Sequence, residues 1–193
     1  MTFRAALFPL ALLPLAACLG GDGSLSPAAT AEARLLAFDP DVYGSLAANE
    51  TYPEEGRATY TGSTIVLRLS ERDAAAAPVY LGAVTLEADF GDGVLTGTAG
   101  DFVLAVADGT GAGDIPIITG AAAVDGSARI TGTFSGEGPT MDMTGTLDGQ
   151  SFDAGLNFGF SGPDLERLEG QGLVGRTTET WELWNVFISA DRD

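Results

Sequence analysis

The chain has 193 residues and is strongly acidic, because 27 Asp and Glu stand against 9 basic residues, all arginine, for a net charge of −18. The chain has one cysteine and no histidine, so it cannot form a Ser-His-Asp triad or a histidine-ligated zinc site. It also has no lysine, which excludes a P-loop lysine and a Schiff base. A chain this acidic repels phosphate backbones, so we expect no nucleic-acid partner.

Residues 1–17 have the pattern of a secretory signal peptide. Arg4 supplies the positive charge, and the apolar run 5–17 ends in small residues. Pro9 and Pro14 interrupt this run, and it is shorter than the roughly 20 residues of a membrane-spanning helix. We therefore predict that residues 1–17 are removed, which takes Arg4 with them and leaves a net charge of −19.

The only cysteine comes directly after this signal. Leu15, Ala16, Ala17 and Cys18 resemble the bacterial lipobox, in which the cysteine becomes the lipidated N-terminus. A lone cysteine cannot form an intramolecular disulfide, and lipidation gives a reason for one; the alternative is an ordinary signal cut with Cys18 incidental. We predict that Cys18 is lipidated and that the lipid joins the protein to a membrane.

The residues after Cys18 support two further inferences. Leu19 stands where an aspartate would retain an enterobacterial lipoprotein at the inner membrane, so by resemblance to that sorting rule we expect an outer-membrane lipoprotein, on its periplasmic or surface face. Residues 18–33 are rich in Gly, Ser, Pro and Ala, which predicts a flexible tether. Residues 34–193 then form a single domain.

Most of that domain alternates apolar and polar residues with a period of two, which is typical of half-buried strands. The clearest run is Phe152–Phe160, with Phe, Ala and Leu on one face and Asp, Gly and Asn on the other. Similar runs surround Ile65, Val84, Leu104, Ile130 and Met143. Short helical segments are expected only at 31–38 and 164–168.

Glycine-containing turns separate these runs. Gly91-Asp92-Gly93, Asp125-Gly126 and Asp148-Gly149 suit the positive φ angles of tight turns between antiparallel strands. Eight to ten strands in an up-and-down order predict a small antiparallel β-barrel of about eight strands, because closure removes exposed sheet edges. A β-sandwich is the alternative fold.

The C-terminal segment 181–189 is apolar on both faces. Trp184, Val186 and Ile188 fall on one face of a strand, and Trp181 and Phe187 on the other. This pattern favours a strand that is bulged or covered on its outer side. Packing of Trp181 and Trp184 is favoured over a ligand platform, although both roles stay open.

Five short motifs resemble the β-barrel domain of transferrin-binding protein B-like lipoproteins. They are A-T-Y-T-G at 58–62, L-G-A at 81–83, D-F-G at 89–91, L-T-G at 95–97 and I-T-G-T-F at 130–134. The resemblance implies an eight-stranded barrel on a lipid anchor, in a group whose characterised members bind host iron proteins, haem carriers or complement regulators. The closing F-x-G-p-x-A-x-E-x-g-G pattern of that family is absent, and no functional residue carries over.

The remaining site predictions lie in loops. Asp108 to Asp114 is acidic and glycine-rich but lacks the spacing of a calcium loop, so we expect a hairpin tip and no metal. The segments 39–56, with Tyr43 and Tyr52, and 70–78 are candidate contact loops.

The favoured function is that of a non-enzymatic, monomeric, lipid-anchored binding protein without a cofactor, related to host-protein or iron and haem acquisition. Three alternatives stay open: a structural envelope lipoprotein without a ligand, a small membrane-spanning barrel, and a carboxylate-based hydrolase with two acids in one cleft.

Overall fold

A computed structural model describes residues 25–36, 52–69, 79–110, 116–134, 138–162, 164–174 and 183–193. These residues form one helix and nine strands: α1 (Pro27–Leu36), β1 (Arg57–Leu69), β2 (Val79–Asp89), β3 (Val94–Thr110), β4 (Pro116–Ala123), β5 (Gly126–Thr133), β6 (Thr140–Leu147), β7 (Gln150–Ser161), β8 (Arg167–Val174) and β9 (Leu183–Arg192).

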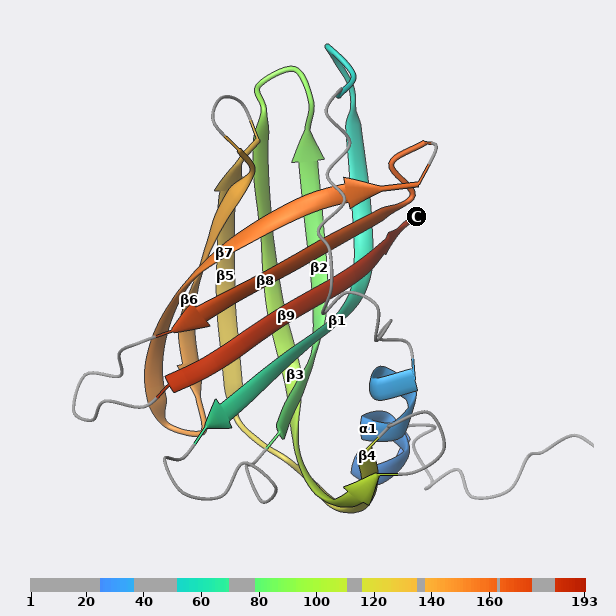
Figure 1. The fold of residues 1–193 in the computed structure, drawn as a ribbon, viewed down its shortest axis with the longest axis vertical. Coiled ribbons are helices and arrows are strands. Elements are labelled where there is room, and N and C mark those ends of the chain that lie inside the picture. The colour runs from blue at the N-terminus through green and yellow to red at the C-terminus, as the bar shows by residue number, and fades with distance from the viewer. Residues whose placement is uncertain are drawn as a thin grey trace, which may run out of the picture.

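Eight of the strands close into a barrel (Figure 1). The sheet order is β2-β1-β9-β8-β7-β6-β5-β3-β4, and β2 also pairs with β3, which joins the two sides of the ring and leaves β4 outside it. Every pairing is antiparallel. This confirms the predicted antiparallel barrel over a sandwich.

The barrel is apolar inside and polar outside. On β7, Phe152, Ala154 and Leu156 are buried, whereas Asp153 and Asn157 are exposed, so the predicted alternation is confirmed. The largest fully buried side chains in the interior are Tyr60, Phe102, Phe158, Phe160, Leu86, Leu95, Ile130, Met141 and Met143. The interior is thus filled by side chains, and its polarity is the reverse of a membrane-spanning barrel, which is apolar toward lipid.

Close packing in this interior requires a glycine on β2. A Cβ added at Gly82 would lie 2.5 Å from Cε1 of Phe102, whose ring occupies that space and is almost fully buried. Real Cβ atoms do not approach another heavy atom so closely, so a larger residue at position 82 must displace the ring.

The predicted hairpin at Asp125-Gly126 is wrong. The first half of β3 pairs with β5, from Val94 to Ala99, and its second half pairs with β4, from Val103 to Thr110. Since β4 and β5 both run antiparallel to β3, the chain continues in the same direction through residues 124 and 125. Asp-Gly is a local turn signal and carries no information about which strand each flank pairs with. By contrast, Asp148 and Gly149, with φ of 52° and 74°, form the predicted β6–β7 hairpin.

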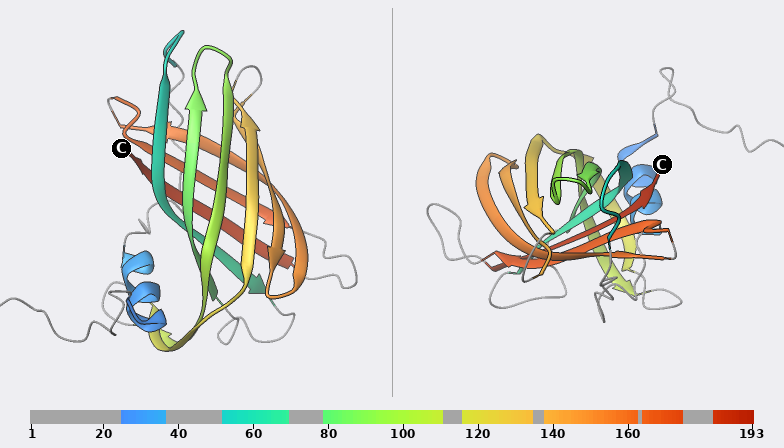
Figure 2. Two further views of the ribbon diagram at one scale, coloured as in Figure 1. Left: turned by 180° about the vertical axis from the view of Figure 1, so that it is seen from behind. Right: turned by 90° about the horizontal axis from the view of Figure 1, so that it is seen from above.

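Helix α1 begins earlier than expected, within the segment 18–33 predicted as a tether. Ser26 caps it, because its Oγ accepts a hydrogen bond from the backbone N–H of Ala29 at 3.3 Å, and Pro27 fits the first helical position. Figure 2 shows α1 outside the barrel wall, where it packs against β4, β3 and β2. The other expected helix, at 164–168, is not found in the described residues there, because β8 begins at Arg167.

A second hydrophobic cluster, here called the outer cluster, lies beneath α1. It consists of Ala31, Ile65, Leu81, Val103, Ala105 and Phe187, with Leu35, Leu67, Val79, Ile118 and Ala121 packed against them. Phe187 on β9 points outward into this cluster, while Val186 and Ile188 point into the barrel. This confirms the expected cover at Phe187, the apolar residue of that face whose side chain the structure describes.

Candidate binding surface at the loop end

The antiparallel order places alternate connections at opposite ends of the barrel. One end, here called the loop end, carries residues 52–56 before β1, the β2–β3 turn 90–93, residues 138 and 139 before β6, and residues 162 and 164–166 before β8. The opposite end carries the β6–β7 turn and the start of α1, as Figure 1 shows. Because side chains fill the interior, any binding site must lie on the outer surface or on these ends.

An aromatic cluster supports the loop end from inside. The ring of Tyr52 meets Phe134 edge-on at a centroid distance of 5.3 Å and Phe160 at 5.6 Å. Phe134 also contacts Phe160 at 5.3 Å and Phe90 at 5.6 Å. Edge-on pairs of this kind stabilise by roughly 0.5–1.5 kcal/mol each beyond area burial, so the loops rest on a rigid base.

Tyr52 is the predicted contact residue that the structure places at this end. It is partly buried, and burial raises the pKa of its hydroxyl above the usual range. Its segment is tied to the β2–β3 turn, because the backbone N–H of Phe90 donates to the carbonyl of Gly56 at 2.9 Å. The ring of Tyr52 is therefore part of the aromatic support as well as of the surface.

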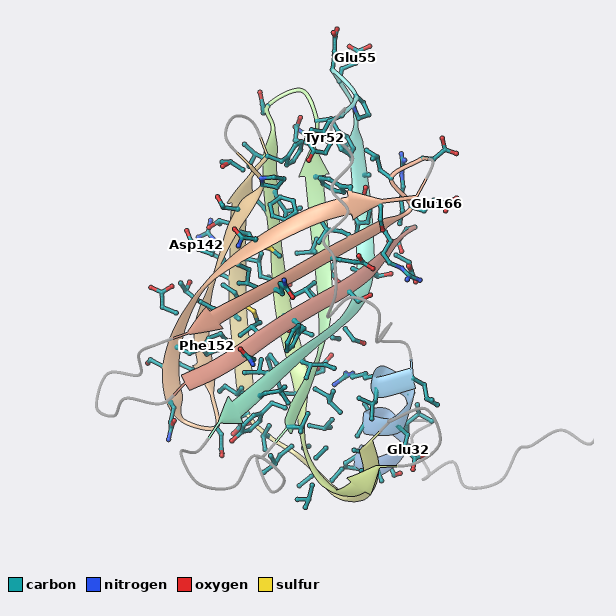
Figure 3. All side chains as sticks on the ribbon, viewed as in Figure 1. Glu32, Tyr52, Glu55, Asp142, Phe152 and Glu166 are labelled. Carbon is teal, nitrogen blue, oxygen red and sulfur yellow. The ribbon has the colours of Figure 1, made fainter. Side chains whose placement is uncertain are left out.

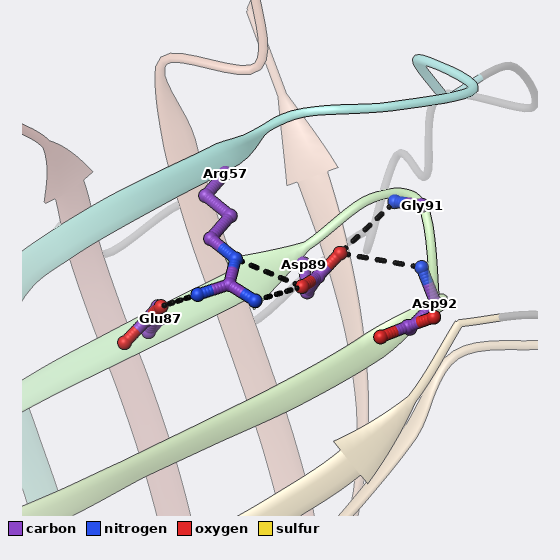
Figure 4. A network of polar contacts seen from close by, with 5 residues as sticks. All are labelled: Arg57, Glu87, Asp89, Gly91 and Asp92. Atoms are coloured by element: carbon purple, nitrogen blue, oxygen red, sulfur yellow. Dashed lines mark hydrogen bonds and ion pairs between the residues drawn. The ribbon is translucent and has the colours of Figure 1, made fainter.

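A polar network fixes the β2–β3 turn (Figure 4). Oδ1 of Asp89 accepts hydrogen bonds from the backbone N–H groups of Gly91 and Asp92 at 3.1 and 3.2 Å. Its Oδ2 accepts from Nη2 and Nε of Arg57 at 2.8 and 2.9 Å, and Nη1 of Arg57 lies 3.5 Å from Glu87. The hydrogen bond from Asp92, with those from Gly91 and Arg57, lowers the pKa of Asp89.

The connection between β7 and β8 is held in a similar way. The buried hydroxyl of Tyr60 donates to the carbonyl of Leu165 at 2.9 Å, and Leu165 adopts a positive φ of 55°. Arg192 donates from its backbone N–H to the carbonyl of Glu166 at 2.7 Å and from Nη1 to the carbonyl of Asp164 at 2.8 Å. Burial raises the pKa of the Tyr60 hydroxyl above its usual range.

The loop end is acidic. The exposed acids in its connecting segments are Glu54, Glu55, Asp92, Asp164 and Glu166, of which Glu55 and Glu166 are labelled in Figure 3, and Asp191 and Asp193 at the end of β9 are exposed beside them. Three guanidinium groups lie nearby: those of Arg57 and Arg167 are held in ion pairs with carboxylates of their own sheet, and that of Arg192 donates to the carbonyl of Asp164, so the acids outnumber the cations. The surface offered to a partner is therefore negative, and a positive surface would be attracted to it.

Most other predicted site residues lie outside the part of the chain that the structure describes. This holds for Cys18, Tyr43, Asp114 and Trp181 as whole residues. Asp108 and Trp184 have a described backbone only, in β3 and β9, so the roles of all six stay predictions. Strand β3 reaches Thr110, which pairs with Pro116 on β4, so residues 108–110 of the expected hairpin tip belong to a strand.

Three absences concern the described ranges alone. No group of three or more metal-ligating side chains occurs in them. The buried polar side chains among these residues are Ser63, Thr64 and Ser189, and none is a carboxylate. No helix in the described part of the chain is long and apolar enough to cross a membrane.

Arg34 on α1 is a contact residue that the sequence pattern did not indicate. Arg34 donates from Nη1 to the carbonyl of Leu81 at 2.8 Å and also to the carbonyl of Asp101. These two bonds join the helix to β2 and β3, and desolvation by burial lowers the pKa of Arg34. The Ser26-Pro27 pair, a cap followed by a helix-starting proline, is the signal in the sequence that could have revealed this helix.

The geometry defines a small, filled, antiparallel β-barrel with an acidic loop end and a helix on its wall. Among known proteins, no family model matches the chain, and no curated protein matches it.

Two solved structures that are similar to it are substitution variants of the vaccine antigen transferrin binding protein B from Haemophilus parasuis Hp5. The single-substitution variant is 16% identical to this chain with a TM-score of 0.46, and the alignment covers 72% of this chain and 27% of that protein. The double-substitution variant is 17% identical with a TM-score of 0.45, and the alignment covers 72% of this chain and 26% of that protein. This chain thus spans about a quarter of the length of those proteins, and the likeness concerns the fold alone.

Proposed function

We propose that the protein is a lipid-anchored, non-enzymatic binding protein of the outer membrane that holds a partner protein at the loop end of its barrel. The observation that carries the proposal is the filled interior, which leaves no room for a small ligand between the strands and moves binding to the surface. Rigid scaffolds commonly carry function on their loops, and here aromatic packing and hydrogen bonds hold those loops in place.

The partner that fits this end is a protein with a basic surface. Glu54, Glu55, Asp92, Asp164 and Glu166 are all exposed there, and complementary charge speeds encounter and selects partners. The proteins of similar fold are named for transferrin, and the sequence motifs resemble the same family, so iron-carrier and haem-carrier proteins are the first partners to examine.

Surface plasmon resonance on the immobilised mature chain tests this function. Iron-carrier and haem-carrier proteins are passed over two immobilised variants, each of which loses three acids. One carries Glu54→Gln, Glu55→Gln and Glu166→Gln at the loop end, and the other carries Glu32→Gln, Asp125→Asn and Asp153→Asn away from it. We expect binding to weaken at least tenfold in the loop-end variant only. Equal weakening in both would show a nonspecific charge effect and contradict the proposal.

The anchor has its own test. Expression in a bacterium fed with radiolabelled palmitate should label the chain, and Cys18→Ser should abolish the label. A chain that carries no label with Cys18 intact would contradict lipid attachment and leave the binding test unaffected.

A further inference from the structure

We propose that the barrel meets the lipid bilayer with the side that carries the start of α1 and the β3–β4 projection, so that the loop end points away from the membrane. This orientation rests on the lipid attachment proposed above. Three features support it: the attachment of α1 to the wall, the length of chain between Cys18 and α1, and the apolar side chains exposed at this side.

Helix α1 is fixed to the barrel and is not an independent spacer. Ala31 is fully buried in the outer cluster, and Arg34 bonds to backbone carbonyls of Leu81 on β2 and Asp101 on β3. Two bonds from one charged group to different strands, together with apolar packing, hold the helix at one place and one angle on the wall.

The chain between the lipid and this helix is short. Eight residues, 19–26, separate Cys18 from Pro27. A fully extended chain of this length spans about 30 Å, and a flexible one about 17 Å on average. Measured instead to Tyr52, the next described residue after α1, a fully extended chain from Cys18 would span roughly 110 Å. Docking of α1 therefore shortens the linker between the lipid and the barrel by about a factor of four, and it keeps the barrel wall near the bilayer.

The linker 19–26 ends at the side of the barrel opposite to the loop end. Helix α1 begins beside β4, at the bottom of Figure 1, while the β2–β3 turn lies at the top. The barrel is longer than the average span of this linker, because β2 alone has 11 residues, which extend about 36 Å at the rise of a strand. The end nearest to the lipid is thus the α1 end.

The same side exposes apolar side chains. Leu25, two residues before α1, is 61% exposed, and Val106, on the part of β3 that projects beyond the β5 pairing, is 55% exposed. The other large apolar side chains exposed in the described residues are Leu36, the last residue of α1, and Val94 at the loop end, which is exposed by only 36%. Burying Leu25 or Val106 in the interfacial region of a bilayer contributes on the order of 1 kcal/mol, which orients an already anchored protein but would not anchor a free one.

Energy transfer on vesicles tests the orientation. The full lipoprotein is reconstituted into phosphatidylethanolamine and phosphatidylglycerol vesicles that carry an acceptor dye on their headgroups. A donor dye is placed on a single new cysteine, either Asp125→Cys near the α1 end or Asp92→Cys at the loop end. Because Cys18 carries the lipid, each labelled site is unique. We expect transfer from position 125 to exceed transfer from position 92 at least twofold.

Releasing α1 from the barrel should abolish the difference in energy transfer between positions 125 and 92. The double substitution Ala31→Glu and Arg34→Ala breaks both attachments, and Glu32→Gln, at an exposed position of the same helix, serves as the matched control that keeps it. Near-ultraviolet circular dichroism checks that the barrel stays folded.

The outcomes separate the two proposals. Equal transfer from positions 92 and 125 in the unreleased protein overturns the orientation, and so does a difference that survives release of α1. Flotation with the vesicles is measured in the same samples. A chain that does not float overturns both the anchor and the orientation, whereas one that floats with equal transfer overturns the orientation alone.

Discussion

The two hydrophobic clusters of this molecule are built differently. The barrel interior takes side chains from eight strands that hydrogen bonds join into a closed ring. The outer cluster depends on a helix of 10 residues, a length that is marginal by itself in water, and on the side chain of Arg34. The interior therefore carries the stability of the fold, and the outer cluster sets where the N-terminal segment attaches to the barrel.

Among variants that test whether the interior carries the stability, we expect the largest effect from Phe160→Ala. Phe160 is fully buried and contacts Tyr52, Phe90, Phe134 and Phe158. We expect the free energy of unfolding to fall by about 3–5 kcal/mol in urea denaturation, from lost burial and the cavity left behind. Leu36→Ala, at a position that is 70% exposed, is the control and should change it by less than about 0.5 kcal/mol. A loss below about 1 kcal/mol in Phe160→Ala would contradict a tightly packed interior.

Overpacking the same interior should have the next largest effect. In Gly82→Ala the new methyl group meets the ring of Phe102, and we expect a loss of about 1–3 kcal/mol. Gly100→Ala is the matched control, because a Cβ there has nothing within 4 Å. Adding Phe102→Leu to Gly82→Ala should make the two losses less than additive in a double-mutant cycle. Strict additivity would show that Phe102 is not what makes position 82 tight.

The same division explains which features the sequence could predict. The interior imposes a period of two on each strand, so β7, expected at 152–160, is found at Gln150–Ser161. The turn at Asp148-Gly149 was predictable because both of its residues need positive φ. The aromatic cluster that supports Tyr52 was not, because it joins side chains from four separate segments of the chain.

The outer cluster was harder to predict for a physical reason. Helix α1 is made of small residues that resemble a linker, and its stability comes from contact with strands distant in the chain. The apolar outer face around Phe187 indicated that something covers the strand but could not say what. The local turn signal at Asp125-Gly126 likewise could not predict that β4 and β5 both pair with one long strand, β3.

Detaching α1 should affect one cluster and spare the other. Ala31→Glu places a carboxylate in the outer cluster, where Ala31 is fully buried. Amide hydrogen exchange should accelerate by at least tenfold along Pro27–Leu36, while the amides of β6 and β7 keep their protection. Glu32→Gln, on an exposed position of the same helix, should leave both unchanged. Acceleration throughout the barrel would mean that the two clusters unfold as one unit.

The smallest expected effect lies at the loop end, where Asp89→Asn removes a carboxylate from the surface network. Hydrogen bonds from Asp92, Arg57 and Gly91 lower its folded-state pKa below its ordinary value. Its contribution to stability is therefore present above the unfolded pKa and is lost as the pH falls through the folded pKa. The difference in urea midpoint between the unsubstituted chain and Asp89→Asn should be small, because the pair is exposed, and should vanish at low pH.

Glu87→Gln separates the contributions to this network, because it removes only the longer contact of Arg57, at 3.5 Å. The bonds from Gly91 and Asp92 to Asp89 remain, so this variant should keep the pH-dependent difference from Asp89→Asn. Carboxyl carbon chemical shifts, followed by nuclear magnetic resonance during an acid titration, measure the Asp89 pKa directly. If that pKa rose to its ordinary value in Glu87→Gln, then Glu87, by holding Arg57 in place, and not the turn, would be what stabilises the Asp89 carboxylate.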